Sequence, residues 1–197
     1  MAKLYFKYGA MGSSKTAQAL ITKFNYEERS MKVWLIKPAV DNRDGERIIR
    51  SRIGLSASCE IIFDRENIYD IFLCSHSDCD VVIADECQFF TEEHIDQLRK
   101  IVDELNIPVM CFGLRADFMC KLFTGSKRLF ELADSISEIK TICSCGAKAT
   151  VNARLDVGMN IVTEGAQVLL GGNDRYIAMC HKCWQERIKN QNARKGD

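Results

Sequence analysis

The stretch that decides the fold is Tyr8-Gly9-Ala10-Met11-Gly12-Ser13-Ser14-Lys15-Thr16. It lies between the apolar run Leu4-Tyr5-Phe6 and a helical pattern from Ala17 to Tyr26. The spacing matches the phosphate-binding template G-x-x-x-x-G-K-[ST], with serine at the second glycine position. In such a loop the backbone N–H groups and the helix start face the phosphates, and the lysine reaches the β and γ phosphates. The stretch therefore predicts a nucleotide site on Gly9–Thr16.

Ser14 is where this stretch departs from the template. If that position needs a positive φ or a close approach to phosphate, a Cβ there costs about 1 kcal/mol or more. An ordinary glycine-bearing turn between a strand and a helix is the alternative interpretation. The strand, loop and helix context favours nucleotide binding.

The length and charge of the chain limit its partners. A chain of 197 residues suits one domain with a modest appendage. Lys plus Arg and Asp plus Glu number 27 each, so no overall field attracts nucleic acid or an anionic membrane. The apolar runs, such as Val81–Ala84, are too short to span a bilayer, and no apolar signal segment follows Met1. We expect a cytoplasmic protein that binds neither nucleic acid nor membrane.

Short β-like runs alternate with helical patterns through the first two thirds of the chain, which is typical of a parallel sheet with helices on both faces. The expected strands are Leu4–Lys7, Lys32–Lys37, Glu60–Phe63, Val81–Ala84 and Val109–Gly113. The expected helices are Lys15–Ser30, Asn67–Cys74, Thr91–Leu105 and Lys127–Ala133. Thr91 is the expected N-cap of its helix, with two glutamates following it.

The segment between Pro38 and Ser58 has charges of both signs and little apolar periodicity. A solvated loop is one interpretation. The other is a loop over the nucleotide, in which some of the arginines contact phosphate. The sequence favours neither interpretation over the other.

A second candidate site follows the run Val81–Ala84, where Asp85 and Glu86 stand at the carboxyl end of an expected parallel strand. Asp85 is expected to hold Mg²⁺ opposite Thr16. Neighbouring strand residues point to opposite faces, which leaves Glu86 available as a general base for an attacking hydroxyl group or water. An acidic pair in an ordinary turn is the alternative.

Aromatic residues gather near this acidic pair. Phe89 and Phe118 lie beyond expected strand ends, where a pocket for a planar base and simple core packing are both reasonable interpretations.

Four of the ten cysteines form two close pairs near the C-terminal end, Cys143 with Cys145 and Cys180 with Cys183. Two such pairs across a β-rich insert are typical of a structural zinc site. With four protein ligands the metal has no open position for catalysis. His181 could replace one cysteine, and a redox pair is the rival interpretation.

Together these features resemble the zinc-containing thymidine kinases of bacteria and the animal cytosol, from Lys3 to about Trp184. The matching pieces are Gly9–Thr16, Lys37-Pro38 with Asp41-x-Arg43, Asp85-Glu86-x-Gln88-Phe89-Phe90, Phe112-Gly113-Leu114-Arg115-x-Asp117-Phe118, the two cysteine pairs, and Gly171-Gly172-x-Asp174-x-Tyr176.

The resemblance implies ATP- and Mg²⁺-dependent phosphorylation of the 5′-hydroxyl of thymidine, a salvage step toward DNA precursors, with Glu86 as general base. It implies ATP contacts at Gly9, Ala10, Met11, Gly12, Ser13, Ser14, Lys15, Thr16, Asp85, Glu86, Cys87 and Gln88. It implies nucleoside contacts at Phe89, Leu114, Phe118, Val168, Gly171 and Tyr176. Zinc would hold the stem of the Val162–Arg175 segment, which folds over the base. A homotetramer and feedback inhibition by dTTP are also implied.

The expected fold is α/β, a P-loop NTPase-type (RecA-like) parallel sheet flanked by helices, with a small β-rich zinc-binding lasso domain. The expected boundaries are 1–141 for the ATP-binding domain, 142–190 for the lasso domain and 191–197 for a flexible tail. A zinc-bearing DNA-dependent P-loop ATPase, a nucleotide kinase with a zinc-clipped lid, and a non-catalytic nucleotide-binding module are the alternatives.

Overall fold

The computed structural model describes residues 1–41, 45, 47–168 and 175–194. Its centre is a six-stranded parallel sheet with the strand order β5-β2-β6-β7-β1-β8. The strands are β1 (Leu4–Gly9), β2 (Val33–Pro38), β5 (Glu60–Ile62), β6 (Val81–Ala84), β7 (Val109–Leu114) and β8 (Ser135–Glu138). All the strands expected in the first two thirds of the chain are present, with small shifts at their ends. The predicted α/β fold is confirmed.

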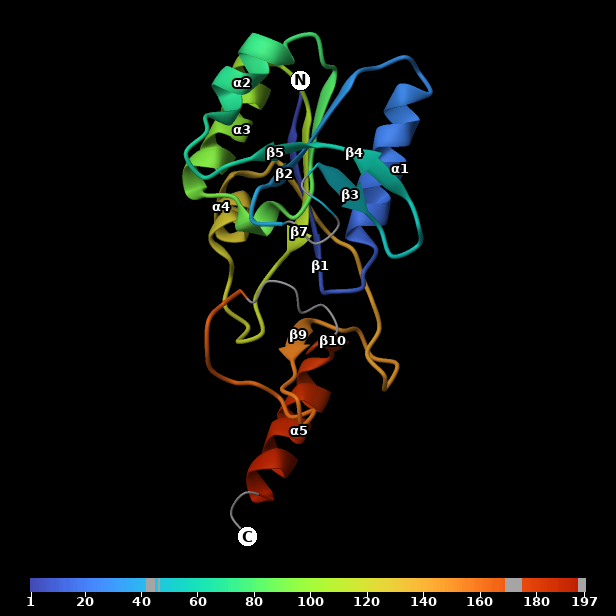
Figure 1. The fold of residues 1–197 in the computed structure, drawn as a ribbon, viewed down its shortest axis with the longest axis vertical. Helices are drawn as coiled ribbons and strands as arrows, with labels where there is room; N and C mark the ends of the chain where they lie inside the picture. The colour runs from blue at the N-terminus through green and yellow to red at the C-terminus, as the bar shows by residue number, and fades with distance from the viewer. Residues whose placement is uncertain (42–44, 46, 169–174, 195–197) are drawn as a thin grey trace.

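Helices cover both faces of this sheet (Figure 1). On one face lies α1 (Lys15–Glu27), and on the other lie α2 (Ile68–Ser75), α3 (Glu92–Leu105) and α4 (Thr124–Leu132). The strand β6 is buried along its whole length, and its residues alternate between the two cores: Val81 and Ile83 face α1, while Val82 and Ala84 face the other helices. The continuous apolar sequence of this strand is therefore explained by cover on both sides.

Helix starts follow the expected capping chemistry at α3. The Thr91 hydroxyl accepts the backbone N–H of His94 at 3.1 Å, and Glu92 and Glu93 occupy the first turn. The cap satisfies one of the free N–H groups, and the two carboxylates oppose the positive end of the helix dipole. At α1 the helix ends at Glu27 rather than Ser30, because Ser30 adopts a left-handed conformation with φ 59°.

Four of the described elements, β3, β4, β8 and η1, were not expected from the sequence. The hairpin of β3 (Ile48–Arg50) and β4 (Ser56–Ser58) lies inside the segment whose low apolar periodicity suggested a loop. The edge strand β8 was also not expected. Its sequence is Ser-Ile-Ser-Glu, and none of its four residues is fully buried. A short 3₁₀ helix, η1 (Cys87–Phe89), directly follows the acidic pair.

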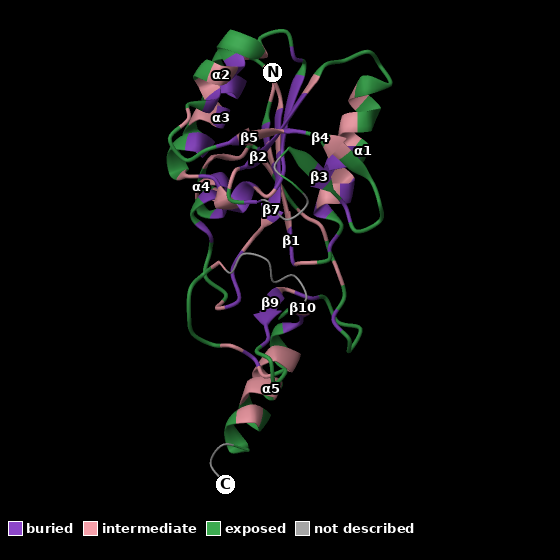
Figure 2. Cartoon of the chain, viewed as in Figure 1, coloured by how far each residue is buried: buried purple, intermediate pink, exposed green. Residues whose placement is uncertain are grey.

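The C-terminal part of the chain forms a smaller unit beyond the end of the sheet (Figure 1). Strands β9 (Val151–Arg154) and β10 (Tyr176–Met179) pair antiparallel, and α5 (His181–Ala193) follows. This unit has a core of its own, separate from the two cores of the main sheet (Figure 2). The helix α5 includes the first three residues of the expected tail, 191–193.

Among the described helices, none is both long and apolar enough to cross a membrane.

Candidate active site

The phosphate-binding stretch forms the turn between β1 and α1. A side chain at Gly9 would clash, because a Cβ there would lie 2.4 Å from Ser13 Oγ and 2.5 Å from the Ile139 carbonyl oxygen. Lys15 is buried, and its Nζ donates to the Ala10 carbonyl at 2.9 Å and to Ser13 Oγ at 3.4 Å. The loop is therefore closed on itself, with its lysine held at the base of the turn.

Ser14 adopts the conformation that its position in the template suggests for glycine. Its φ is 63° and its ψ is 27°, which lies in the left-handed region. It is the N-cap residue of α1, yet its side chain makes no capping hydrogen bond. The backbone geometry of the loop is thus kept with serine present, at the cost of local strain.

Asp85 stands at the end of β6, where the Thr16 hydroxyl donates a hydrogen bond to it. Its side chain is 3% exposed. Burial first and the nearby Glu86 second raise the pKa of Asp85 to about 7, while the Thr16 hydrogen bond opposes the shift. A hydroxyl and a carboxylate in contact are the oxygen donors that Mg²⁺ prefers, so this pair fits the ion that the sequence predicts.

Glu86 occupies the turn directly after Asp85 and also has a positive φ, 50°. Gln88 Nε2 donates to Glu86 Oε2 at 2.5 Å, and the backbone N–H of Leu114 donates to Gln88 Oε1 at 2.9 Å. The carboxylate is therefore oriented by a buried amide that is itself fixed on β7. A strained backbone at a turn that aims one polar side chain is typical of functional sites.

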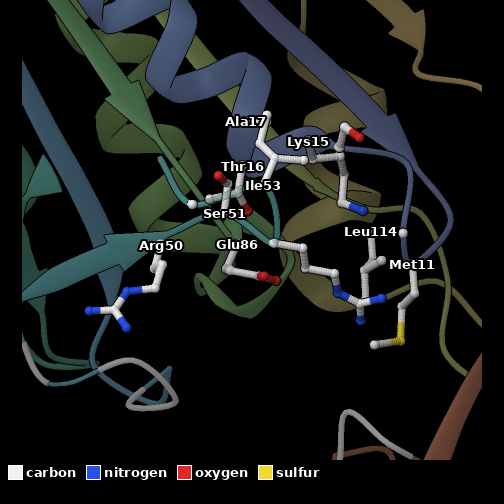
Figure 3. Close-up of a pocket in the computed structure, with 13 residues that line it drawn as sticks. Met11, Lys15, Thr16, Ala17, Arg50, Ser51, Ile53, Glu86 and Leu114 are labelled. Atoms are coloured by element: carbon white, nitrogen blue, oxygen red, sulfur yellow. The ribbon is translucent and has the colours of Figure 1, made fainter. Parts of the chain in front are cut away.

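Glu86 and the phosphate-binding stretch line one cavity of about 640 Å³ (Figure 3). Its volume lies within the usual range of small-molecule sites. Its lining residues come from the phosphate-binding stretch, the β3–β4 hairpin and the ends of β6 and β7: Met11, Gly12, Ser14, Lys15, Thr16, Ala17, Arg50, Ser51, Arg52, Ile53, Gly54, Glu86 and Leu114.

The hairpin contributes two cations to this cavity, Arg50 and Arg52. A Cβ built on Gly12 would lie 3.9 Å from Arg52 Nη1, so this guanidinium reaches the phosphate-binding stretch. Neither arginine is paired with a carboxylate among the residues that the structure describes. The sequence placed arginines in this segment without assigning them, and the position of Arg52 favours the interpretation in which one of them meets phosphate.

Cys87 and Gln88, which the resemblance implies as ATP contacts, are buried in η1 and are not among the lining residues of this cavity. The Cys87 thiol is hydrogen-bonded with Cys111, and burial raises the pKa of Cys87 well above its usual value. Gln88 reaches the site through hydrogen bonds to two residues that line the cavity, Glu86 and the Leu114 backbone N–H.

The predicted nucleoside residues are spread over three elements. Leu114 lines the cavity at the end of β7. Phe118 is buried, Phe89 is half-buried with its ring edge-on to Phe123 at 5.6 Å, and Val168 and Tyr176 are half-buried. Gly171 lies outside the described residues.

Two buried charged residues to which the sequence assigned no role, Arg154 and Asp117, hold this region together. The Arg154 guanidinium carbon lies 3.5 Å from the Phe118 ring centroid, and Arg154 Nη1 donates to the Ala166 carbonyl at 2.8 Å. Asp117 accepts from Gln167 Nε2 at 2.9 Å. Both residues thus hold Ala166 and Gln167 in the neighbourhood of Phe118. An arginine within the β-like run of β9 is the signal that could have found the first of them.

The four predicted cysteine ligands come together at the start of the C-terminal unit. The Sγ atoms of Cys143, Cys145, Cys180 and Cys183 all lie within 4.8 Å of one another. Backbone N–H groups of Cys145 and Cys180 lower the pKa of Cys143 to about 6, so one thiol of the group readily ionises. Four thiols converging at this distance fit Zn²⁺ with a closed ligand set. His181 is exposed beside Trp184 and does not belong to the group.

Comparison with known proteins identifies the family. The thymidine kinase family model matches residues 2–184. A thymidine kinase of Yersinia pseudotuberculosis is 42% identical over 191 residues, which cover 96% of this chain and 97% of the relative. Thymidine kinases of Agrobacterium fabrum and Zymomonas mobilis are 44% and 41% identical, over 94% and 96% of this chain and 97% and 100% of the relatives. The chain therefore belongs to the thymidine kinase family.

Proposed function

We propose that this protein transfers the γ-phosphoryl group of ATP to the 5′-hydroxyl of thymidine, with Glu86 as the general base. The observation that carries the proposal is that Glu86 lines the same cavity as Lys15 and Thr16. A phosphate-binding loop and a carboxylate that face one space are what hydroxyl phosphorylation requires. The thymidine kinases to which the chain is similar support thymidine as the acceptor.

In the proposed reaction the phosphates of ATP lie against the backbone N–H groups of the loop and the start of α1. Lys15 and Arg52 offset the charge on the γ-phosphoryl group during transfer. Thr16 and Asp85 would hold Mg²⁺, which when bound neutralises part of the charge on the β and γ phosphates.

The base is needed because the acceptor is an alcohol. The 5′-hydroxyl group loses its proton to a Glu86 oxygen while its own oxygen bonds to the γ phosphorus, and ADP leaves with the electrons of the broken P–O bond. Gln88 donates to the other side of the same carboxylate, which keeps Glu86 aimed into the cavity. A phosphate acceptor is already ionised near neutral pH and needs no such base.

The nucleoside is proposed to lie between Leu114 and the Val162–Arg175 segment, with Phe118 and Tyr176 around the base. This arrangement is supported by the contacts of Arg154 and Asp117, which bind that segment close to Phe118. Zinc on the four cysteines would hold its stem, and 142–190 would then act as the lasso domain on an ATP-binding domain of 1–141.

Two further properties are proposed from the family resemblance, a homotetramer and inhibition by dTTP at the substrate site. An exposed pair of apolar side chains on α1, Ile21 and Phe24, is the kind of surface that association would cover. Light scattering of the purified protein measures the assembly. A cytoplasmic location belongs to the same proposal.

The test is an assay with γ-labelled ATP against each natural nucleoside, with and without DNA. Label transferred to thymidine, and far less to purine nucleosides, is the expected result. Release of free phosphate that depends on DNA but not on nucleoside would favour the ATPase alternative. Transfer to a nucleotide would favour a nucleotide kinase, and no transfer at all would favour a non-catalytic binding module.

A further inference from the structure

A buried amide in the C-terminal unit joins two loops of the main sheet. Asn152 lies on β9 and is 4% exposed. Its Oδ1 accepts the backbone N–H of Met11 at 2.7 Å, and its Nδ2 donates to the Ala116 carbonyl at 2.7 Å. An N–H can only donate and a carbonyl can only accept, so the two partners determine which end of the amide faces which loop.

The two partners belong to different halves of the candidate active site. Met11 is part of the phosphate-binding stretch and lines the cavity. Ala116 lies in the segment after β7, between Leu114, which also lines the cavity, and the buried Phe118. The Asn152 side chain therefore connects the loop proposed for ATP with the loop proposed for the nucleoside. Met11 is 141 positions and Ala116 is 36 positions away from it in the sequence.

The same strand also holds the segment proposed to fold over the nucleoside. Asn152 and Arg154 are two residues apart on β9, so their side chains share one face of the strand. Arg154 stacks on Phe118 and donates to the Ala166 carbonyl, while Asn152 holds Met11. A displacement of β9 would therefore reach the phosphate-binding stretch directly, through the bond from Met11 to Asn152.

Other polar contacts between the C-terminal part and the main sheet are weaker or lie elsewhere. Thr141 Oγ1, directly before the C-terminal part, donates to the Gly12 carbonyl at 3.4 Å, and Arg115 Nη2 donates to the Thr150 carbonyl at 3.2 Å. Lys148 Nζ pairs with Glu138 at 2.7 Å on the exposed side of the junction. Among the residues described at this junction, Asn152 is the one whose side chain bonds both to the phosphate-binding stretch and to the segment after β7.

We propose that Asn152 is a positioning residue that couples thymidine binding to ATP binding by joining the nucleoside loop to the phosphate-binding stretch. The inference rests on the proposed function for its two ligands. Two sites coupled through a shared element change each other's affinity by the same factor, typically about 5- to 150-fold. Removing the two hydrogen bonds of Asn152 should lower this coupling factor by more than it lowers the affinity for either ligand measured alone.

The matched variants are Asn152→Leu, Asn152→Asp and Lys148→Gln. Leucine has a similar volume and makes neither bond. Aspartate keeps an acceptor for the Met11 N–H but sets a second oxygen against the Ala116 carbonyl. Lys148→Gln removes a different contact across the same junction and serves as the control.

The coupling is measured by calorimetric titration of thymidine with and without a non-hydrolysable ATP analogue, alongside zinc content and steady-state kinetics. We expect Asn152→Leu to lower the coupling factor to near 1 and to lower kcat/KM for ATP by about tenfold, within the usual range of coupling energies. Asn152→Asp should fall between it and the wild type, and Lys148→Gln should keep the wild-type coupling. Wild-type coupling in Asn152→Leu, or equal loss in Lys148→Gln, would overturn the inference.

A measurement on the unaltered protein covers the case in which Asn152→Leu fails to fold. If Asn152 transmits nucleoside binding, thymidine alone should slow amide hydrogen exchange in the peptide that contains Met11. Exchange there that ignores thymidine overturns the inference even when the enzyme is active. Failure of the proposed function is a different result, since the wild type would then transfer no phosphate to thymidine.

Discussion

Gln88 Nε2 donates to Glu86 Oε2 at 2.5 Å, and this is the contact that orients the proposed base. Gln88 is itself fixed by the Leu114 N–H, which donates to its Oε1 at 2.9 Å. We expect Gln88→Leu to leave KM for ATP almost unchanged and to lower kcat by about tenfold, which corresponds to 1.4 kcal/mol of lost orientation.

A matched control for Gln88→Leu is Gln97→Leu on α3. Gln97 Oε1 accepts the Ile68 N–H at 2.8 Å, a comparable bond far from the cavity. Its loss should lower the free energy of unfolding by about 1 kcal/mol with kcat intact. Equal loss of kcat in both variants would show that Gln88 acts through stability alone.

Glu86→Gln tests the base directly. The amide preserves the size of the side chain but accepts no proton, so kcat should fall by roughly 10²- to 10⁴-fold while nucleotide affinity is retained. Steady-state kinetics measures the fall in kcat, and titration with an ATP analogue checks that the nucleotide affinity is unchanged. Wild-type turnover with thymidine would remove Glu86 from the role of base.

The parts of this fold that could be predicted from sequence are those with a local signal. Buried parallel strands such as Val81–Ala84 are apolar throughout, and the phosphate-binding stretch has a fixed spacing. The spacing of the two cysteine pairs likewise predicts a metal site. Edge strand β8 and the β3–β4 hairpin lack such signals, because exposed short strands are stabilised by pairing rather than by an apolar pattern.

The polar bridges of the site could not be predicted, because each joins residues that are distant in sequence. Asn152 and Arg154 are polar residues within a β-like run, which marks them only as unusual. Their partners, the Met11 N–H and the Ala166 carbonyl, are backbone groups and leave no trace in the residue types. Gln88 illustrates the same limit: the resemblance implied a contact with ATP, but the hydrogen bond from its side chain to Glu86 could not be predicted from the sequence.

Ser14→Gly should stabilise the protein. Serine at φ 63° costs about 1 kcal/mol, and the greater freedom of glycine in the unfolded chain offsets about half of this. No capping bond is lost, since the Ser14 side chain makes none. The melting temperature should rise by about 1–2 °C without loss of activity.

Ser30→Gly is the control for that substitution, because Ser30 has a φ of 59° in the turn after α1. A similar rise in melting temperature is expected there, with no change in KM for ATP. If Ser14→Gly instead lowers the melting temperature while Ser30→Gly raises it, the Ser14 side chain contributes a stabilising contact that this account omits.

Arg52→Gln tests the cation that the β3–β4 hairpin brings to the phosphate-binding stretch. Loss of one charge aimed at the γ-phosphoryl group should lower kcat/KM for ATP by about 100-fold, the lower end for a single stabilising donor. KM for thymidine should change little. Arg29→Gln, at an exposed arginine in the turn after α1, is the control for lost surface charge. Equal effects of the two substitutions would exclude a specific role for Arg52.

Cys143→Ser tests the predicted zinc site and its role as a stem. The pKa of Cys143 is lowered by backbone N–H groups, so its loss removes a ligand that ionises readily. We expect zinc content to fall from one equivalent to a small fraction, and proteolysis within the Val162–Arg175 segment to accelerate. Cys74→Ser, at an exposed cysteine of α2, should keep full zinc and wild-type proteolysis. Full zinc in Cys143→Ser by elemental analysis would refute the ligand assignment, whereas lost zinc with unchanged proteolysis would refute the stem role alone.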